Sequence, residues 1–287
     1  MKFVPLHVYS GYTFLQSGLT IEKIQKSILT NGYFGGGLSD KHVMFGVPEF
    51  VNMMEKVNRP YIVGIELEID DNIICLFVIN EEGYLNLSYI SSLLEKNEFN
   101  KDILLSHNKG LIAVLDTNKG MVKEKFLDVK TSEEEFARYL LDINDMFEDF
   151  YLGIEVKSKE EINYANKLRN FALNHTYKTV AFPHIKYQKK DDAIVLTICE
   201  AISHDEVIDI KEASGQDYFM KEDDLAKIYT PREMQNTIEI VKKSSFNYHL
   251  KRGEMLHYPV TDSPKYLRDR CYTSLKEKGL EDRKSTR

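Results

Sequence analysis

The chain has 287 residues and a formal net charge of −7, with 43% hydrophobic and 29% charged residues. This balance is that of a folded globular protein, and the length allows one large domain or two ordinary ones. The acidic charge argues against a surface that grips nucleic acid by itself, since phosphate binding requires a basic face. The sequence contains neither an apolar run long enough to span a membrane nor a signal peptide, so we expect a cytoplasmic protein without membrane contacts.

The first two thirds of the sequence alternate between short apolar runs and helical patterns. This alternation predicts an α/β fold with a largely parallel sheet, either closed into a barrel or open. A turn at residues 70–72 joins two of the strands directly. The predicted strands are residues 3–8, 34–38, 61–69, 73–79, 110–115, 150–156 and 178–182, and the predicted helices are residues 21–29, 45–57, 85–94, 133–147 and 160–173.

From about residue 191 the pattern contains helices only. We predict helices at residues 191–202, 221–229, 230–244 and 265–278, with Pro231 at a helix start. The predicted organisation is therefore a domain at residues 1–190, a helical segment at residues 191–280 and a disordered charged tail at residues 281–287.

Polar residues stand at the predicted strand ends, where functional groups of barrel proteins gather. His7 ends the first strand, Asp40 the second, Glu66 lies in the third, and His184 follows the last. Each has an ordinary reading: Asp40, for example, is equally a helix N-cap. Glu66 in an apolar strand is costly unless it is paired or bound to a metal.

Taken in order, these segments resemble the PHP domain family, in the branch that forms the amino-terminal part of bacterial DNA polymerase III alpha subunits. That branch reads roughly H-x-H-S-x-Y-S, T-D-H-G-x-M-F-G, G-x-E and T-N-D-V-H-Y. The corresponding segments here are residues 7–13, 39–46, 64–66 and 182–187. Further similarity at residues 79–87, 110–114, 233–240 and 266–276 extends the resemblance over nearly the whole chain. It implies a PHP-type distorted (β/α)7 barrel followed by a small helical segment that leads toward a polymerase palm, which is absent here.

The resemblance implies a metal site, and this sequence departs from it. An active PHP site uses His, Asp, Glu and Cys ligands to hold metal ions that generate a nucleophilic hydroxide. The chain keeps His7, Asp40 and Glu66, and has Tyr9 where a second histidine is expected. Lys41 and Lys186 also replace histidines, His184 replaces an aspartate, and Thr117 and Lys157 are aligned with the middle positions.

A charged lysine has no lone pair to offer a cation. One hypothesis is that Lys41, Lys157 and Lys186 replaced the metals as counter-charges to Asp40 and Glu66; the alternative is that these lysines point to solvent. His42 and His184 could also rebuild a reduced site with His7, Asp40 and Glu66, since four ligands suffice for one ion. We expect a vestigial site at His7, Asp40, Glu66 and His184 with no metal bound, or Zn or Mn if it is occupied.

The resemblance thus implies a structural and interaction module of a replicase, without catalytic residues of its own. Its expected partners are the rest of the polymerase chain and other replisome proteins. The complete polymerase would bind DNA and use Mg²⁺. The alternatives are a metal-dependent phosphoesterase or 3′–5′ exonuclease, and a degenerate paralogue without a replicative role.

Overall fold

Six strands form one mixed sheet in the computed structural model, which describes residues 2–205, 215–248 and 258–279. The strands follow one another in sequence order across the sheet. They are β1 (Gly36–Lys41), β2 (Tyr61–Ile69), β3 (Asn72–Val78), β4 (Leu111–Asp116), β5 (Phe150–Ile154) and β6 (Thr179–Ala181). β3 runs antiparallel to β2 and β4, and the remaining neighbours are parallel.

The antiparallel strand has a local cause. Asp70 and Asp71 both have positive φ values, 47° and 57°, as a tight two-residue hairpin turn requires. The turn reverses the chain directly from β2 into β3, so no crossover helix intervenes. The sheet is therefore mixed, and less uniformly parallel than the alternation of strands and helices predicted.

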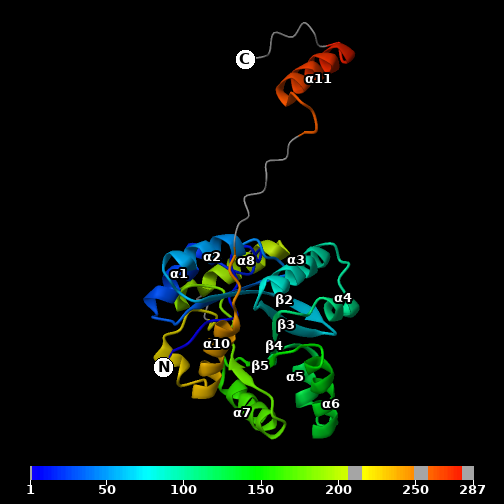
Figure 1. Cartoon of the computed structure of the whole chain (residues 1–287). Coiled ribbons are helices and arrows are strands. Elements are labelled where there is room, and N and C mark those ends of the chain that lie inside the picture. Colours follow the sequence, from blue (N-terminus) through cyan, green and yellow to red (C-terminus); the bar gives the residue numbers. More distant parts are fainter. Residues whose placement is uncertain (1, 206–214, 249–257, 280–287) are drawn as a thin grey trace. The chain divides into compact units, whose positions relative to one another are not determined.

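Residues 3–9 close the two edges of the sheet. The sequence predicts a strand here, but the segment is extended without a regular ladder and forms one isolated bridge, between Val8 and Ile185. On the other side, the amides of Gly37 and Ser39 in β1 donate to the carbonyls of Pro5 and Val8 at 2.7 and 2.9 Å. The curled sheet and this segment make a distorted α/β barrel, with helices on its outside (Figure 1).

Helices follow most strands, and several begin at a side chain that caps their free amide groups. Asn80, Ser132 and Ser158 each accept a hydrogen bond from the third residue of the helix that follows. The helices are α1 (Ile21–Thr30), α2 (Val47–Lys56), α3 (Glu81–Glu95), α4 (Lys101–Ser106), α5 (Gly120–Leu127), α6 (Glu133–Asn144), α7 (Lys159–Asn174), the 3₁₀ turn η1 (Lys190–Ala193), α8 (Ile194–His204), α9 (Glu222–Leu225), α10 (Pro231–Lys243) and α11 (Ser263–Glu277).

Helix α10 closes the end of the barrel where the parallel strands begin. Thr237 accepts a hydrogen bond from the amide of Val4 at 3.0 Å, and Asn236 donates to the carbonyl of Thr179 at 2.6 Å. Ile238 and Val241 join the apolar interior formed by alternate residues of the strands. The predicted helical segment therefore supplies part of the barrel core.

The structure divides after Tyr248, into residues 1–248 and 249–287, and the predicted boundary at residue 190 does not coincide with that division. Apolar residues of α10 complete the barrel interior, which explains why the larger unit extends past residue 190. In the second unit, α11 has no buried residue. The predicted tail at residues 281–287 lies outside the described residues. No helix in the described ranges is long and apolar enough to cross a membrane.

Candidate functional site

The inward side chains of the barrel change from apolar to polar where the parallel strands end. Along β2 the inward positions are Ile62, Gly64 and Glu66, two residues apart, as expected for a strand. The same spacing leads to Asp116 at the end of β4, and to Glu155 and His184 just after β5 and β6. All four polar side chains are buried. The strand pattern therefore places titratable groups at the mouth opposite α10.

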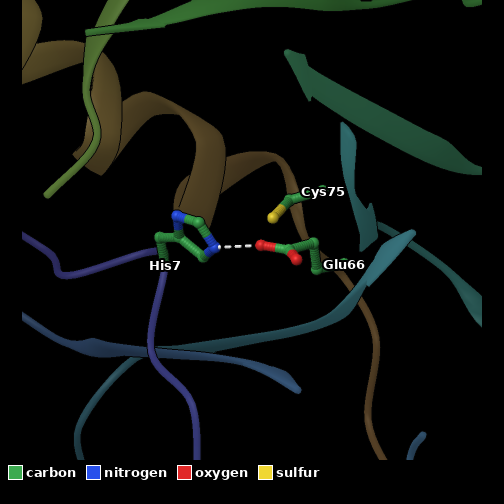
Figure 2. Close-up of side chains that lie close together, drawn as sticks. All are labelled: His7, Glu66 and Cys75. Carbon is green, nitrogen blue, oxygen red and sulfur yellow. Dashed lines mark hydrogen bonds and ion pairs between the residues drawn. The ribbon is translucent and has the colours of Figure 1, made fainter. Parts of the chain in front are cut away.

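Glu66 forms the centre of this mouth. Its Oε2 atom lies 2.7 Å from Nε2 of His7, and the thiol of Cys75 on the neighbouring strand β3 is close to both (Figure 2). Burial alone would raise the pKa of Glu66. Hydrogen bonding with His7 and the charge of that imidazole, helped by Tyr9 and Lys119, outweigh burial and lower the pKa to about 2. Glu66 is therefore a carboxylate at neutral pH.

The two histidines of the mouth stack on each other. The ring centroids of His7 and His184 are 3.8 Å apart, and Tyr9 meets the His184 ring edge-on at 4.3 Å. Burial, with smaller effects from His7, Lys186 and Lys119, lowers the pKa of His184 well below its ordinary value. Nδ1 of His7 and Nε2 of His184 are buried and have no hydrogen-bond partner among the described residues. His184 is thus a neutral imidazole.

Asp40 belongs to a separate polar cluster. Its Oδ1 accepts from the amide of Ser10 at 2.6 Å and from the hydroxyl of Thr13 at 2.7 Å, and its Oδ2 accepts from the hydroxyl of Ser10 at 2.7 Å. Burial raises the pKa of Asp40 despite these hydrogen bonds. Three donors from the loop after residue 9 thus hold this carboxylate.

Two lysines place their ammonium groups among the carboxylates of the mouth. Lys157 Nζ lies 3.0 Å from Glu155 Oε1 and 2.8 Å from Asp217 Oδ1. Lys119 Nζ lies 3.4 Å from Asp116 Oδ2 and 3.4 Å from Nδ1 of His184. Burial would lower the pKa of both lysines, but the neighbouring carboxylates outweigh it and raise both values. Both ammonium groups are therefore charged and paired.

Lys186 and Lys41, the other two lysines that the sequence predicted in the site, have surroundings different from those of Lys157. Lys186 lies with its ammonium 5.8 Å from the centre of the Tyr9 ring, and burial together with Lys119 and Lys157 lowers its pKa, opposed by Asp217. Lys41 ends β1 and pairs in register with Glu66 through its backbone. Of the three predicted lysines, Lys41, Lys157 and Lys186, only Lys157 forms an ion pair in the described part of the chain. Its partners are Glu155 and Asp217, whereas the prediction named Asp40 and Glu66.

Sequence reasoning missed several members of the site. Alternate residues of each strand face the barrel interior, and this alternation would have predicted three of them once the strand ends were known: Asp116, Glu155 and Cys75. Lys119 and Asp217 were not predictable in this way, because one lies in a loop and the other comes from a distant segment. Thr117 is buried, and its hydroxyl donates to the carbonyl of Gly153 at 2.6 Å.

A cluster of metal ions does not fit these residues. The Asp40 carboxylate accepts hydrogen bonds from three donors. The ammonium group of Lys157 lies beside Glu155, and that of Lys119 lies beside Asp116 and Nδ1 of His184. A protonated lysine cannot ligate a cation and repels it. The ligand atoms of His7, Glu66 and Cys75 lie within 4.8 Å of one another. That set can hold one ion at most.

The family model of the PHP domain matches residues 5–159, more than half of the chain. The chain belongs to the PHP domain family. It is also similar to DNA polymerase III subunit alpha from three bacteria: Helicobacter pylori strain J99 (26% identity, 87% of this chain and 23% of that protein), Bacillus subtilis strain 168 (24%, 97% and 26%) and Rickettsia felis (29%, 91% and 23%). The chain spans about a quarter of the length of these relatives.

Among solved structures, an amidohydrolase from Chromobacterium violaceum matches with a TM-score of 0.42 and 10% identity. The match covers 64% of this chain and 87% of that one. The similarity to the polymerase subunits extends beyond residue 159, since it covers up to 97% of the chain. The PHP domain and the helices after it therefore resemble one segment of these polymerases.

Proposed function

We propose that this chain is the PHP module of a replicative DNA polymerase alpha subunit, and that it serves as a structural and interaction module without hydrolytic activity. The similarity to polymerase III alpha subunits over most of the chain supports the replicative context. The expected partners are the rest of a polymerase chain and other replisome proteins, and DNA is contacted through the complete enzyme. Mg²⁺ would serve that enzyme at its polymerase centre.

The proposal that the chain does not hydrolyse phosphoesters rests on one observation: Lys157 Nζ lies between Glu155 and Asp217, at 3.0 and 2.8 Å. Metal-assisted hydrolysis needs divalent cations held by carboxylates and neutral imidazoles. Here the single positive charge of Lys157 lies between two such carboxylates, and the ammonium group of Lys119 lies 3.4 Å from Asp116. The ion pairs stabilise the buried carboxylates without a metal. The barrel therefore stays folded but does not catalyse metal-assisted hydrolysis.

A second candidate is hydrolysis that depends on a single ion, and the grouping of His7, Glu66 and Cys75 favours it. A thiolate, an imidazole and a carboxylate are all zinc ligands. One feature opposes it: burial raises the pKa of the Cys75 thiol, which must lose its proton to bind zinc.

The experiment that separates the two candidates measures metal content and turnover on the same preparation. The purified chain is analysed for Zn and Mn by mass spectrometry, and its thermal stability is compared with and without a chelator. It is then assayed on single-stranded DNA and on bis-p-nitrophenyl phosphate with added Mn²⁺ or Zn²⁺. We expect trace metal, no change of melting temperature with the chelator, and no turnover.

The controls are Glu66→Gln and Cys75→Ser. One equivalent of metal in the wild type that both substitutions abolish, together with turnover, would establish the single-ion hydrolase and overturn our proposal. The replicative assignment has its own test, which is the gene sequence after the codon for Arg287. A following polymerase palm with paired aspartates is expected, and a gene without one would remove the replicative role.

A further inference from the structure

A basic cavity lies on the outside of the barrel, apart from the mouth. It has a volume of about 500 Å³ and is bounded by the end of α1, the start of η1 and residues 218–224. Four of the residues that line it are lysines: Lys26, Lys189, Lys190 and Lys221. The volume is that of a small-molecule site, for which about 300–1,000 Å³ is usual.

The charges that line this cavity are strongly unbalanced. Its one acidic lining residue is Asp224, and that carboxylate is paired with Lys227 at 2.8 Å. None of the four lysines forms an ion pair within the described ranges of the chain, and all four side chains are exposed. The negative end of helix α1 offsets only about half a charge. In a chain with a net charge of −7, the lining of this cavity therefore carries an excess of positively charged side chains.

The walls of the cavity are held in place by hydrogen bonds. Gln188 donates to the hydroxyl of Ser27 at 3.1 Å, which ties the approach to η1 to α1. The buried hydroxyl of Tyr33 donates to the carbonyl of Met220, next to Lys221. Because both sides are anchored to the barrel, the lysine stems start from fixed positions. The cavity is thus largely formed before any ligand arrives.

Two other features of the lining narrow the class of ligand. Tyr218 is half-buried and stacks on the buried Tyr187, with ring centroids 6.4 Å apart, so its ring has a fixed support. Thr30, Asn31 and Gln188 also line the cavity, and the side-chain amides of Asn31 and Gln188 donate to Ser27. Lysines bind phosphate as point charges, and a supported aromatic ring is a platform for a base.

We propose that this cavity binds the phosphate groups of a nucleotide, with Lys26, Lys189, Lys190 and Lys221 as the anion-binding residues and Tyr218 beside the base. The ligand is either a free nucleotide or one unit of a single strand, and the two share this chemistry. An acidic peptide is a poorer fit, because it would leave the aromatic ring of Tyr218 without a role.

The test measures binding of three probes to the 287-residue chain: ATP, inorganic tripolyphosphate and a fluorescein-labelled single-stranded oligodeoxynucleotide. The variant is Lys189→Gln with Lys190→Gln. The matched control is Lys96→Gln with Lys130→Gln, which removes the same charge from exposed lysines outside the cavity. We expect the cavity variant to raise the dissociation constant at least about tenfold, since hydrogen bonds to charged groups have this magnitude. The control should change it little.

The probes separate the two sources of the ligand. Tighter binding of ATP identifies a free nucleotide, and tighter binding of the oligonucleotide identifies a strand. Tyr218→Leu should weaken both and leave tripolyphosphate unchanged, and circular dichroism of each variant checks that it is folded. Equal loss of binding in the control variant, absence of binding by all three probes at millimolar concentration, or tighter binding of a polyglutamate peptide would overturn the proposal.

Discussion

Replacing Lys157 by methionine tests whether an ammonium group stabilises the carboxylates of the barrel mouth. Glu155 has a side chain that is 3% exposed, and the substitution leaves it and Asp217 without the charge that lies 3.0 and 2.8 Å away. Removing one partner of a buried ion pair costs about 3–5 kcal/mol. Because Lys157 is itself 31% exposed, water replaces part of the interaction, and we expect a loss of about 2–3 kcal/mol in the free energy of unfolding.

A double-mutant cycle with Glu155→Gln assigns this loss to the pair. The amide oxygen of a glutamine can still accept the hydrogen bond that the amide of His184 donates to Glu155 at 3.0 Å, so the substitution removes mainly charge. The second change should therefore recover much of the stability that Lys157→Met loses. Urea unfolding followed by circular dichroism gives the four free energies at one pH and salt concentration.

Two results would refute the reasoning. If Lys157→Met is as stable as the wild type, the ammonium group is not needed by the carboxylates. If the effects of the two substitutions simply add, the two groups act independently and the ion pair makes no contribution of its own to the free energy of unfolding.

Two further predictions concern His184 and the packing of α7 against α10. The pKa of His184 is far below that of an unfolded histidine, so its contribution to stability is complete above about pH 6.5 and is lost as the pH falls, by up to about 1.4 kcal/mol per unit. Urea unfolding at several pH values between about 7 and 5 gives the free energy of unfolding as a function of pH. This free energy should fall less with pH in His184→Gln than in the wild type, and an identical slope in the two proteins would contradict the prediction. Arg169 holds the fully buried Glu233 through Nε and Nη2 at 2.7 and 2.9 Å, so Arg169→Met should lower the free energy of unfolding by about 3 kcal/mol. Thermal and urea unfolding measure this loss, Arg169→Met with Glu233→Gln is the control, and an unchanged midpoint would show that the pair is not needed.

The sequence determined most of the secondary structure, because each element depends on interactions close along the chain. The apolar period identified β2 and β3 and the turn between them, and Thr230 with Pro231 predicted the start of α10 within one residue. Residues 3–8 were harder to predict, since an apolar run indicates an extended chain but does not show whether a regular ladder forms. The strand ends likewise indicated that His7, Glu66 and His184 belong to one site.

Only the tertiary structure decided how the charges of that site are paired. Asp217 is 60 residues from Lys157 in the numbering, and the fold brings their charged atoms to 2.8 Å. Composition cannot specify such a contact, because a lysine beside a strand can point to solvent equally well. The sequence gives the types of the charged groups, but their electrostatic energy depends on separations and burial that exist only once the barrel has closed.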